Sequence, residues 1–441
     1  MPSRTPAIQP SDVNPHWKFL CEEIGERRAG SDAEHRSAEY IRQQFRNAGL
    51  NDSRLEAFEC NSLRSARASL EILDIASWIK VPCEVLVGSP STDPAAQPSE
   101  MELIWVEMPE QSGRLKPGSM KGKAIALFGP LATDTQNHRA IVRSGASLVV
   151  WIDDRLPFEW PKADAILPVW RKRVGALPTI AVALRSAYDW RTRGVKRVRA
   201  CVATENVPAI SYNVVGDLKG RDEKLGMLAI GCHYDTQVGN VGADDNASGT
   251  VSVIALAHAF AAAAAKKPFA RTIRFIAFGA EEQLSVGARA YALAHRKEMN
   301  RHALMINLDS LSCALGHTQV LIAGSTQLEK WMVKNMESNG VSPRIFREVT
   351  PFADHFPFTM FGVPALWFAR PNFGNMRWQH HSTHDNLSTV SADAVCTLLN
   401  AIAPLAAKVA DAQSLPFKAG IDKTERPEIK RLALELFDMK I

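Results

Sequence analysis

Apolar runs of strand length alternate with longer segments of helical periodicity between residues 227 and 412 of this 441-residue chain. The expected strands span residues 227–231, 272–278, 303–308, 319–322 and 363–368. The expected helices span residues 247–265, 286–298, 326–338 and 392–412. This alternation predicts an α/β fold class, with a mixed, mostly parallel sheet sandwiched by helices. In such folds ligands bind beyond the carboxyl ends of the strands.

Residues of the types that bind metals follow the strands where the strands end. They are His233 and Asp235 after the first strand, Asp244 in the next loop, Glu281 and Glu282 after the second strand, Asp309 after the third, and His381 after the last. Several carboxylates in one crevice repel one another, and no Lys or Arg lies beside them in the sequence to compensate. Divalent cations remove that repulsion, and histidine with carboxylate suits zinc, with Co²⁺ or Mn²⁺ as further options. The pattern predicts a centre that holds two Zn²⁺ ions.

Two short motifs indicate how the work of this centre is divided. His233 and Asp235 are two residues apart at a strand end, so Asp235 can accept the second ring N–H of His233 and fix its tautomer. Of the adjacent Glu281 and Glu282, one can bind metal while the other faces the water as general base. Near His381, two further histidines are alternative ligands. They are His380 and His384.

The segment from about residue 210 to 412 resembles the clan MH di-zinc aminopeptidases, and residues 17–60 resemble them more weakly. Matched by position, His233 and Asp309 would bind one zinc, Glu282 and His381 the other, Asp244 would bridge both, and Glu281 would be the general base. The family's pattern of a histidine followed by Ser or Thr and, four positions on, by Asp selects His381 with Asp385. The resemblance also implies the zinc-peptidase fold and a cis peptide bond after the bridging aspartate, which here is Asp244–Asp245.

This resemblance implies a metal-dependent hydrolase, a two-zinc aminopeptidase that removes N-terminal residues from peptides. A metal-bridging water would attack the substrate carbonyl with Glu281 as general base, and Asp235 would assist as described. The alternatives are a carboxypeptidase or dipeptidase, an amidase for a specialised small amide, a catalytically silent binding protein, and a single-zinc acyltransferase. The complete set of ligands and base argues against the last two.

The chain is expected to have four parts. Residues 1–64 supply N-terminal helices of the peptidase domain, 65–205 form an insertion, 206–413 form the catalytic domain, and 414–441 form a tail helix. Short β-type runs between Gly, Pro and Ser turns make the insertion β-rich, with one helix near 138–145. The insertion resembles a protease-associated domain. The tail helix either docks on the chain or forms an oligomer contact.

Eight aromatic residues gather between residues 352 and 378. Part of them belongs to the sheet core, but a substrate pocket also needs apolar walls. The candidate pocket residues are Phe352, Asp354, Phe373 and Trp378. Asp354 and its neighbour His355 are equally well explained as groups that cap a helix.

The resemblance implies a peptide or small-amide substrate, and composition argues against other classes of partner. The net charge is only +5 and the basic residues are scattered, which does not favour nucleic acid. The longest nearly uncharged apolar run, residues 253–265, is shorter than the roughly 18 residues of a membrane span. Seven cysteines without a CxxC spacing argue against disulfides and against a cysteine zinc site. The start lacks the apolar core of a signal peptide, so a cytoplasmic location is expected unless a signal has been removed.

Overall fold

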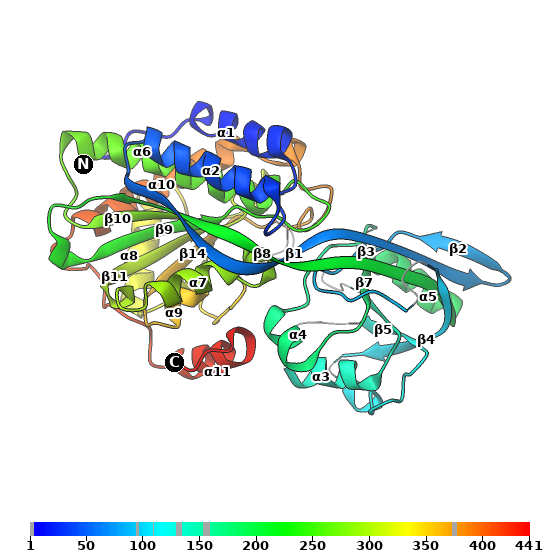
Figure 1. Cartoon of the computed structure of the whole chain (residues 1–441). Helices are drawn as coiled ribbons and strands as arrows, with labels where there is room; N and C mark the ends of the chain where they lie inside the picture. Colours follow the sequence, from blue (N-terminus) through cyan, green and yellow to red (C-terminus); the bar gives the residue numbers. More distant parts are fainter. Residues whose placement is uncertain (1–3, 94–96, 109, 129–134, 153–158, 373–376) are drawn as a thin grey trace. The chain divides into compact units, whose positions relative to one another are not determined.

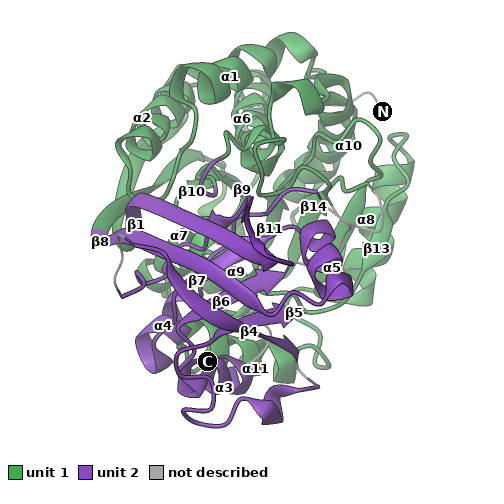
Figure 2. Ribbon diagram, turned by 90° about the vertical axis from the view of Figure 1, so that its right-hand side faces the viewer, with its two compact units in different colours: residues 1–60, 209–236, 240–441 green, residues 61–208, 237–239 purple. Residues whose placement is uncertain are grey.

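The computed structural model describes residues 4–93, 97–108, 110–128, 135–152, 159–372 and 377–441. The chain folds into two compact units, shown in Figure 2. Unit 1 comprises residues 1–60, 209–236 and 240–441, and unit 2 comprises residues 61–208 and 237–239. Two long strands, β1 (Asn51–Asp74) and β8 (Arg197–Leu218), run through both boundaries of the insertion.

Unit 1 is built on a mixed sheet with the strand order β13-β12-β14-β11-β9-β10-β8. Its strands are β9 (Met227–His233), β10 (Thr272–Phe278), β11 (His302–Leu308), β12 (Gln319–Ala323), β13 (Arg344–Phe346), β14 (Ala365–Ala369) and the end of β8. The central strand β9 is parallel to β10 and β11, and β11 is parallel to β14. Strand β8 pairs antiparallel with β10, and β12 pairs antiparallel with β14. The predicted fold class, a mostly parallel α/β sheet, is confirmed.

Helices cover both faces of this sheet (Figure 1). One face packs on α2 (Asp32–Asn47), α6 (Gly249–Lys266), α8 (Thr326–Glu337) and α10 (Ala392–Asp411), and the other on α7 (Val286–Ala294) and α9 (His355–Thr359). Alternation along the strands divides the two cores, since Leu304 and Ile306 of β11 face α6 while Met305 faces α7. By length and composition alone, Ala243–Lys266, which contains α6, and α10 could each cross a membrane, but most of each is buried inside the protein.

The two ends of the chain also pack in unit 1. The chain enters through α1 (Asn14–Lys18) and a π-helical segment, Phe19–Ile24. Ser31 then caps α2 by accepting a hydrogen bond from the backbone of Glu34 at 3.2 Å, as its position before the helix predicts. At the other end, α11 (Arg426–Phe437) buries one face, and the ring of Phe437 lies 5.2 Å from that of Phe356 in α9. The tail helix therefore docks on its own chain.

Unit 2 is more helical than the sequence predicted. Four parallel strands form its centre, in the order β4-β5-β6-β7. Its elements are β2 (Ser77–Val81), β3 (Glu84–Val85), β4 (Ser99–Glu107), β5 (Ala124–Phe128), α3 (Thr135–Ser144), β6 (Leu148–Ile152), α4 (Pro168–Val174), β7 (Thr179–Val182) and α5 (Leu184–Arg193), with parts of β1 and β8. The sequence missed α4 and α5 because both are short and rich in arginine. The assignment as a protease-associated domain stays a prediction.

Candidate metal centre

Histidine and carboxylate side chains from three loops of unit 1 converge on Asp245. One oxygen of this carboxylate, Oδ1, lies 3.2 Å from Nε2 of His233, which is itself 4.0 Å from Oδ1 of Asp309. The other oxygen, Oδ2, lies 2.6 Å from Nδ1 of His380 and 3.5 Å from Nε2 of His381. Asp245 is thus shared by two groups of three residues, each compact enough to hold a metal ion.

Glu281 and Glu282 point toward different imidazoles of this cluster. Oε2 of Glu282 lies 3.0 Å from Nε2 of His381. Oε2 of Glu281 lies 3.9 Å from Nε2 of His233, and its other oxygen accepts a hydrogen bond from Ser285 Oγ at 3.0 Å. The two neighbouring carboxylates therefore have different surroundings, as a division of tasks between them requires.

Asp244 does not lie where the sequence analysis put it. Its Oδ1 accepts hydrogen bonds from the backbone and the hydroxyl of Ser312, at 2.9 and 2.5 Å, and its Oδ2 accepts one from Gln379 at 3.1 Å. The expected position of Asp244 between the two sets of candidate ligands is wrong in this structure, because Asp245 lies there instead. The cis peptide bond is correspondingly Asp245–Asn246 rather than Asp244–Asp245.

Asp385, which the sequence paired with His381, fixes this aspartate loop. Its two oxygens accept the backbone N–H groups of Asp244 and Asp245, at 2.6 and 2.9 Å. The buried guanidinium of Arg27 holds the other side of the loop by donating to several carbonyls, including those of Tyr234 and Val241. With its backbone held at both ends, the loop presents the Asp245 carboxylate in one orientation.

The Asp235 carboxylate forms hydrogen bonds with the backbone of the two glutamates rather than with the His233 imidazole. Its carboxylate accepts the backbone N–H groups of Glu281 and Glu282, at 2.9 and 3.2 Å. Nδ1 of His233 lies 3.2 Å from the backbone oxygen of Asp235 and 3.6 Å from its carboxylate. The expected carboxylate partner of the imidazole is therefore replaced by the backbone carbonyl of the same residue.

Burial and mutual repulsion dominate the electrostatics of the centre. Burial is the largest of the effects that raise the pKa of Glu281 to about 8; His233 opposes it, and the charges of Glu282 and Asp309 add to it. Burial also raises the pKa values of Glu282 and Asp309. Asp245 is the exception. Burial acts to raise its pKa, but Arg377 and His380 lower it well below the usual value.

Besides Asp245, the sequence did not point to Arg377 as a residue of this centre. Its Nη1 lies 3.2 Å from Oδ1 of Asp309 and 3.5 Å from Oδ2 of Asp245, and its Nη2 lies 3.3 Å from His380 Nε2. The sequence pattern at the strand ends does not predict Arg377, because this residue lies in the loop after β14 and its side chain extends to Asp309 and Asp245. Its position four residues before His381 is the only signal in the sequence.

The candidate pocket residues have different surroundings. Phe352 is 49% exposed, and the ring of Trp378 lies 5.9 Å from that of His384. Phe373 lies outside the described residues. Asp354 is fully buried next to α9 and makes no cap hydrogen bond, and neither of its oxygens has a hydrogen-bond partner among the described residues. Burial, followed by repulsion from Glu281, raises its pKa well above the usual value.

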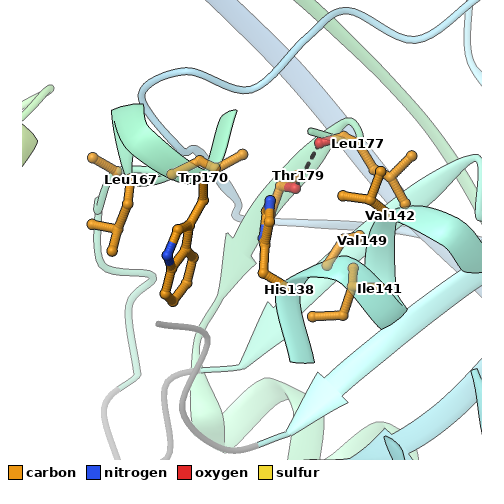
Figure 3. A pocket seen from close by; sticks show the side chains of 10 residues that line it. His138, Ile141, Val142, Val149, Leu167, Trp170, Leu177 and Thr179 are labelled. Carbon is orange, nitrogen blue, oxygen red and sulfur yellow. Dashed lines mark hydrogen bonds between the residues drawn. The ribbon is translucent and has the colours of Figure 1, made fainter. Parts of the chain in front are cut away.

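A separate pocket lies within unit 2 (Figure 3). Apolar side chains line most of it, among them Ile141 and Leu167. Its histidine, His138, lies 2.9 Å from the carbonyl oxygen of Gly175 and stacks on Trp170. Within the described ranges, the two groups around Asp245 are the ones that bring three metal-binding side chains together.

Part of this chain is similar to known peptidases. The model of "Peptidase family M28" matches residues 213–406. Aminopeptidase YwaD of Bacillus subtilis (strain 168) is 25% identical over 191 residues, which cover 42% of this chain and 41% of that protein. The match thus spans less than half of this curated relative.

Solved structures show the fold over nearly the whole chain. The Peptidase M28 precursor from Shewanella amazonensis SB2B has a TM-score of 0.80 at 19% identity, covering 94% of this chain and 96% of that one. BSAP, a zinc aminopeptidase from Bacillus subtilis, has a TM-score of 0.73 at 19% identity, covering 94% and 98%. Residues 213–406 therefore match the model of peptidase family M28, and nearly the whole chain has the fold of these solved structures.

Proposed function

We propose that the chain is a zinc-dependent aminopeptidase that uses two metal ions. The observation that carries this proposal is the position of Asp245, whose two carboxylate oxygens face two different sets of histidines. One carboxylate can serve two metal ions only if each ion finds further ligands on its own side. Relatives named as aminopeptidases support the same activity.

The donor set fits zinc. His233 and Asp309 would bind one ion, Glu282 and His381 the other, and Asp245 would bind both. Buried carboxylates this close together cannot all be charged without nearby cations, and the single guanidinium of Arg377 leaves an excess of negative charge. Imidazole and carboxylate ligands are those that zinc takes in hydrolytic sites. His380 lies near the second ion's place and is the competing ligand.

Glu281 would be the general base. A hydrogen bond from Ser285 occupies its Oε1, which leaves Oε2 to take a proton from the attacking water and to pass it to the leaving amine. The His233 ring would donate from Nδ1 to the Asp235 carbonyl, so Nε2 would carry a free lone pair toward Asp245. When bound, zinc supplies the Lewis acidity that polarises the substrate carbonyl and acidifies water.

A panel of aminoacyl anilides tests this function, with each compound assayed with a free and with an acetylated N-terminus. The zinc-loaded wild type should cleave only the free amines, chelation should abolish cleavage, and added Zn²⁺ should restore it. Glu281→Gln serves as the blank. Cleavage of the acetylated compounds would point to a carboxypeptidase or an amidase instead. No cleavage by the zinc-loaded protein would contradict the proposal.

A further inference from the structure

The turn that carries Glu281 and Glu282 is anchored by a residue from the far N-terminal part of the chain. Glu34 lies in α2, and its side chain is completely buried. Its Oε1 accepts hydrogen bonds from Ser211 Oγ at 2.7 Å and from the backbone N–H of Ala280 at 3.2 Å. Its Oε2 accepts the backbone N–H of Gly30 at 2.6 Å. One carboxylate thus joins α2, β8 and the loop after β10.

Three consecutive N–H groups of this turn donate to carboxylates. That of Ala280 donates to Glu34, and those of Glu281 and Glu282 donate to Asp235. Ala280 has a φ of +51°, a left-handed conformation that a residue with a side chain adopts only when its surroundings hold it. The hydrogen bond that the Ala280 N–H donates to Glu34 therefore restrains the residue whose conformation needs this support.

The packing around Gly279 also shows that the turn lies close against Glu34. A Cβ atom at Gly279 would lie 2.8 Å from Oε1 of Glu34 and 2.3 Å from Oγ of Ser211. The turn therefore approaches the Glu34 carboxylate so closely that only glycine fits before Ala280. Burial, followed by the neighbouring charge of Asp235, raises the pKa of Glu34 well above the usual value, and the hydrogen bonds from Ser211, Gly30 and Ala280 oppose this shift.

We infer that Glu34 is a positioning residue, which sets the place of the Glu281 carboxylate through the backbone of Ala280. The inference rests on the proposed function, in which Glu281 is the general base. A displacement of about 1 Å in a reacting group can cost about 100-fold in rate. Loss of Glu34 should therefore lower kcat while zinc affinity and KM change little. Glu281 follows Ala280 directly, whereas Glu282 lies one residue further from the lost hydrogen bond and keeps its own bond to Asp235.

The test compares Glu34→Ala with Glu56→Gln, a matched control in the same N-terminal segment. Glu56 is a partly buried carboxylate that lies 2.9 Å from the imidazole of His295. In Glu34→Ala we expect kcat to fall about 10- to 100-fold, with two zinc ions retained and KM within about threefold. The control should keep kcat within about twofold. An unchanged kcat in a folded Glu34→Ala variant would overturn the inference.

Two further measurements keep the test decisive. If Glu34→Ala does not fold, Ser211→Ala removes one hydrogen bond to the same carboxylate and should lower kcat by a smaller factor in the same direction. A crystal structure of the folded variant separates this inference from the proposed function, because it needs no activity. The Glu281 carboxylate should be displaced from its wild-type position, and an unmoved carboxylate would contradict the positioning role even if no peptide is cleaved.

Discussion

Two buried polar clusters lie at opposite ends of strand β10, and they differ in charge balance. Near the start of the strand, Arg274 donates to both oxygens of Asp217, at 2.7 and 2.8 Å, and to the hydroxyl of Tyr291 at 3.0 Å. Beyond its end lie Glu281 and Glu282, in a group where carboxylates outnumber the single guanidinium. Both clusters are buried, but only the first is neutral by itself.

The difference separates a structural cluster from a functional one. A buried ion pair whose charges are balanced and whose hydrogen bonds are satisfied needs no bound cation or ligand. Buried carboxylates with too little positive charge nearby repel one another unless a cation binds. Such groups concentrate at functional sites. The following predictions test this comparison, beginning with the largest expected effect.

Asp245→Ala should abolish activity and zinc binding, because this carboxylate is shared by both groups of ligands. Asp244→Asn is the matched control, since its side-chain oxygen can still accept the hydrogen bonds from Ser312. Zinc content after dialysis and the rate of anilide cleavage measure both effects. Zinc retained by Asp245→Ala, or lost from Asp244→Asn, would return the central role to Asp244.

Glu281→Gln should lower kcat by about 10²- to 10⁴-fold, the range of a positioned general base. The amide cannot take the proton from water, but it can still accept the hydrogen bond from Ser285. Zinc content and Tm should therefore stay at their wild-type values. A kcat close to that of the wild type would remove Glu281 from the mechanism.

Arg274→Met should cost about 3–5 kcal/mol of the free energy of unfolding, because the buried Asp217 loses its two close hydrogen bonds and keeps the longer ion pair with Lys219, at 3.9 Å. Activity per folded molecule should not change, since the cluster plays no part in the chemistry. Urea unfolding measures the loss. The double variant Arg274→Met/Asp217→Leu removes both charges and should recover part of it; failure of both expectations would mean that the pair is not structural.

His302, which belongs to the cluster around Arg274, should make the free energy of unfolding depend on pH. Burial, followed by the charge of Arg274, lowers its pKa in the folded chain to about 4, below the 6.5 of a free histidine. Between these values the unfolded state binds a proton that the folded state does not. The free energy of unfolding should therefore fall by about 3 kcal/mol as pH drops from 6.5 toward 4. His302→Gln should remove this part of the slope, and parallel curves for variant and wild type would refute it.

The sequence predicts the sheet well because its strands are buried on both faces. Strand β10 has the predicted bounds, 272–278, and the neighbouring strands differ by one to a few residues. Strands with apolar runs of this kind can be predicted from the local sequence, without knowing which distant residues they contact. In unit 2, by contrast, the helices α4 and α5 lack a strong apolar period, and only the tertiary packing of Trp170 and Trp190 shows why they form.

The site is harder to predict, because its details depend on turns. Asp244 and Asp245 are adjacent and chemically identical, and only the path of the loop decides which side chain faces the histidines. Arg377 and Glu34 reach the centre from loops and helices far away in the sequence. Residue types after strand ends thus predict the kind of site, while the identity of each supporting residue requires the structure.

The most direct test of the two-metal account is an anomalous-scattering map of wild-type crystals grown with zinc. The account predicts two zinc peaks with Asp245 between them, one also bound by His233 and Asp309, the other by Glu282 and His381. A single peak, a bridge formed by Asp244, or His380 in place of His381 would contradict this assignment of the centre.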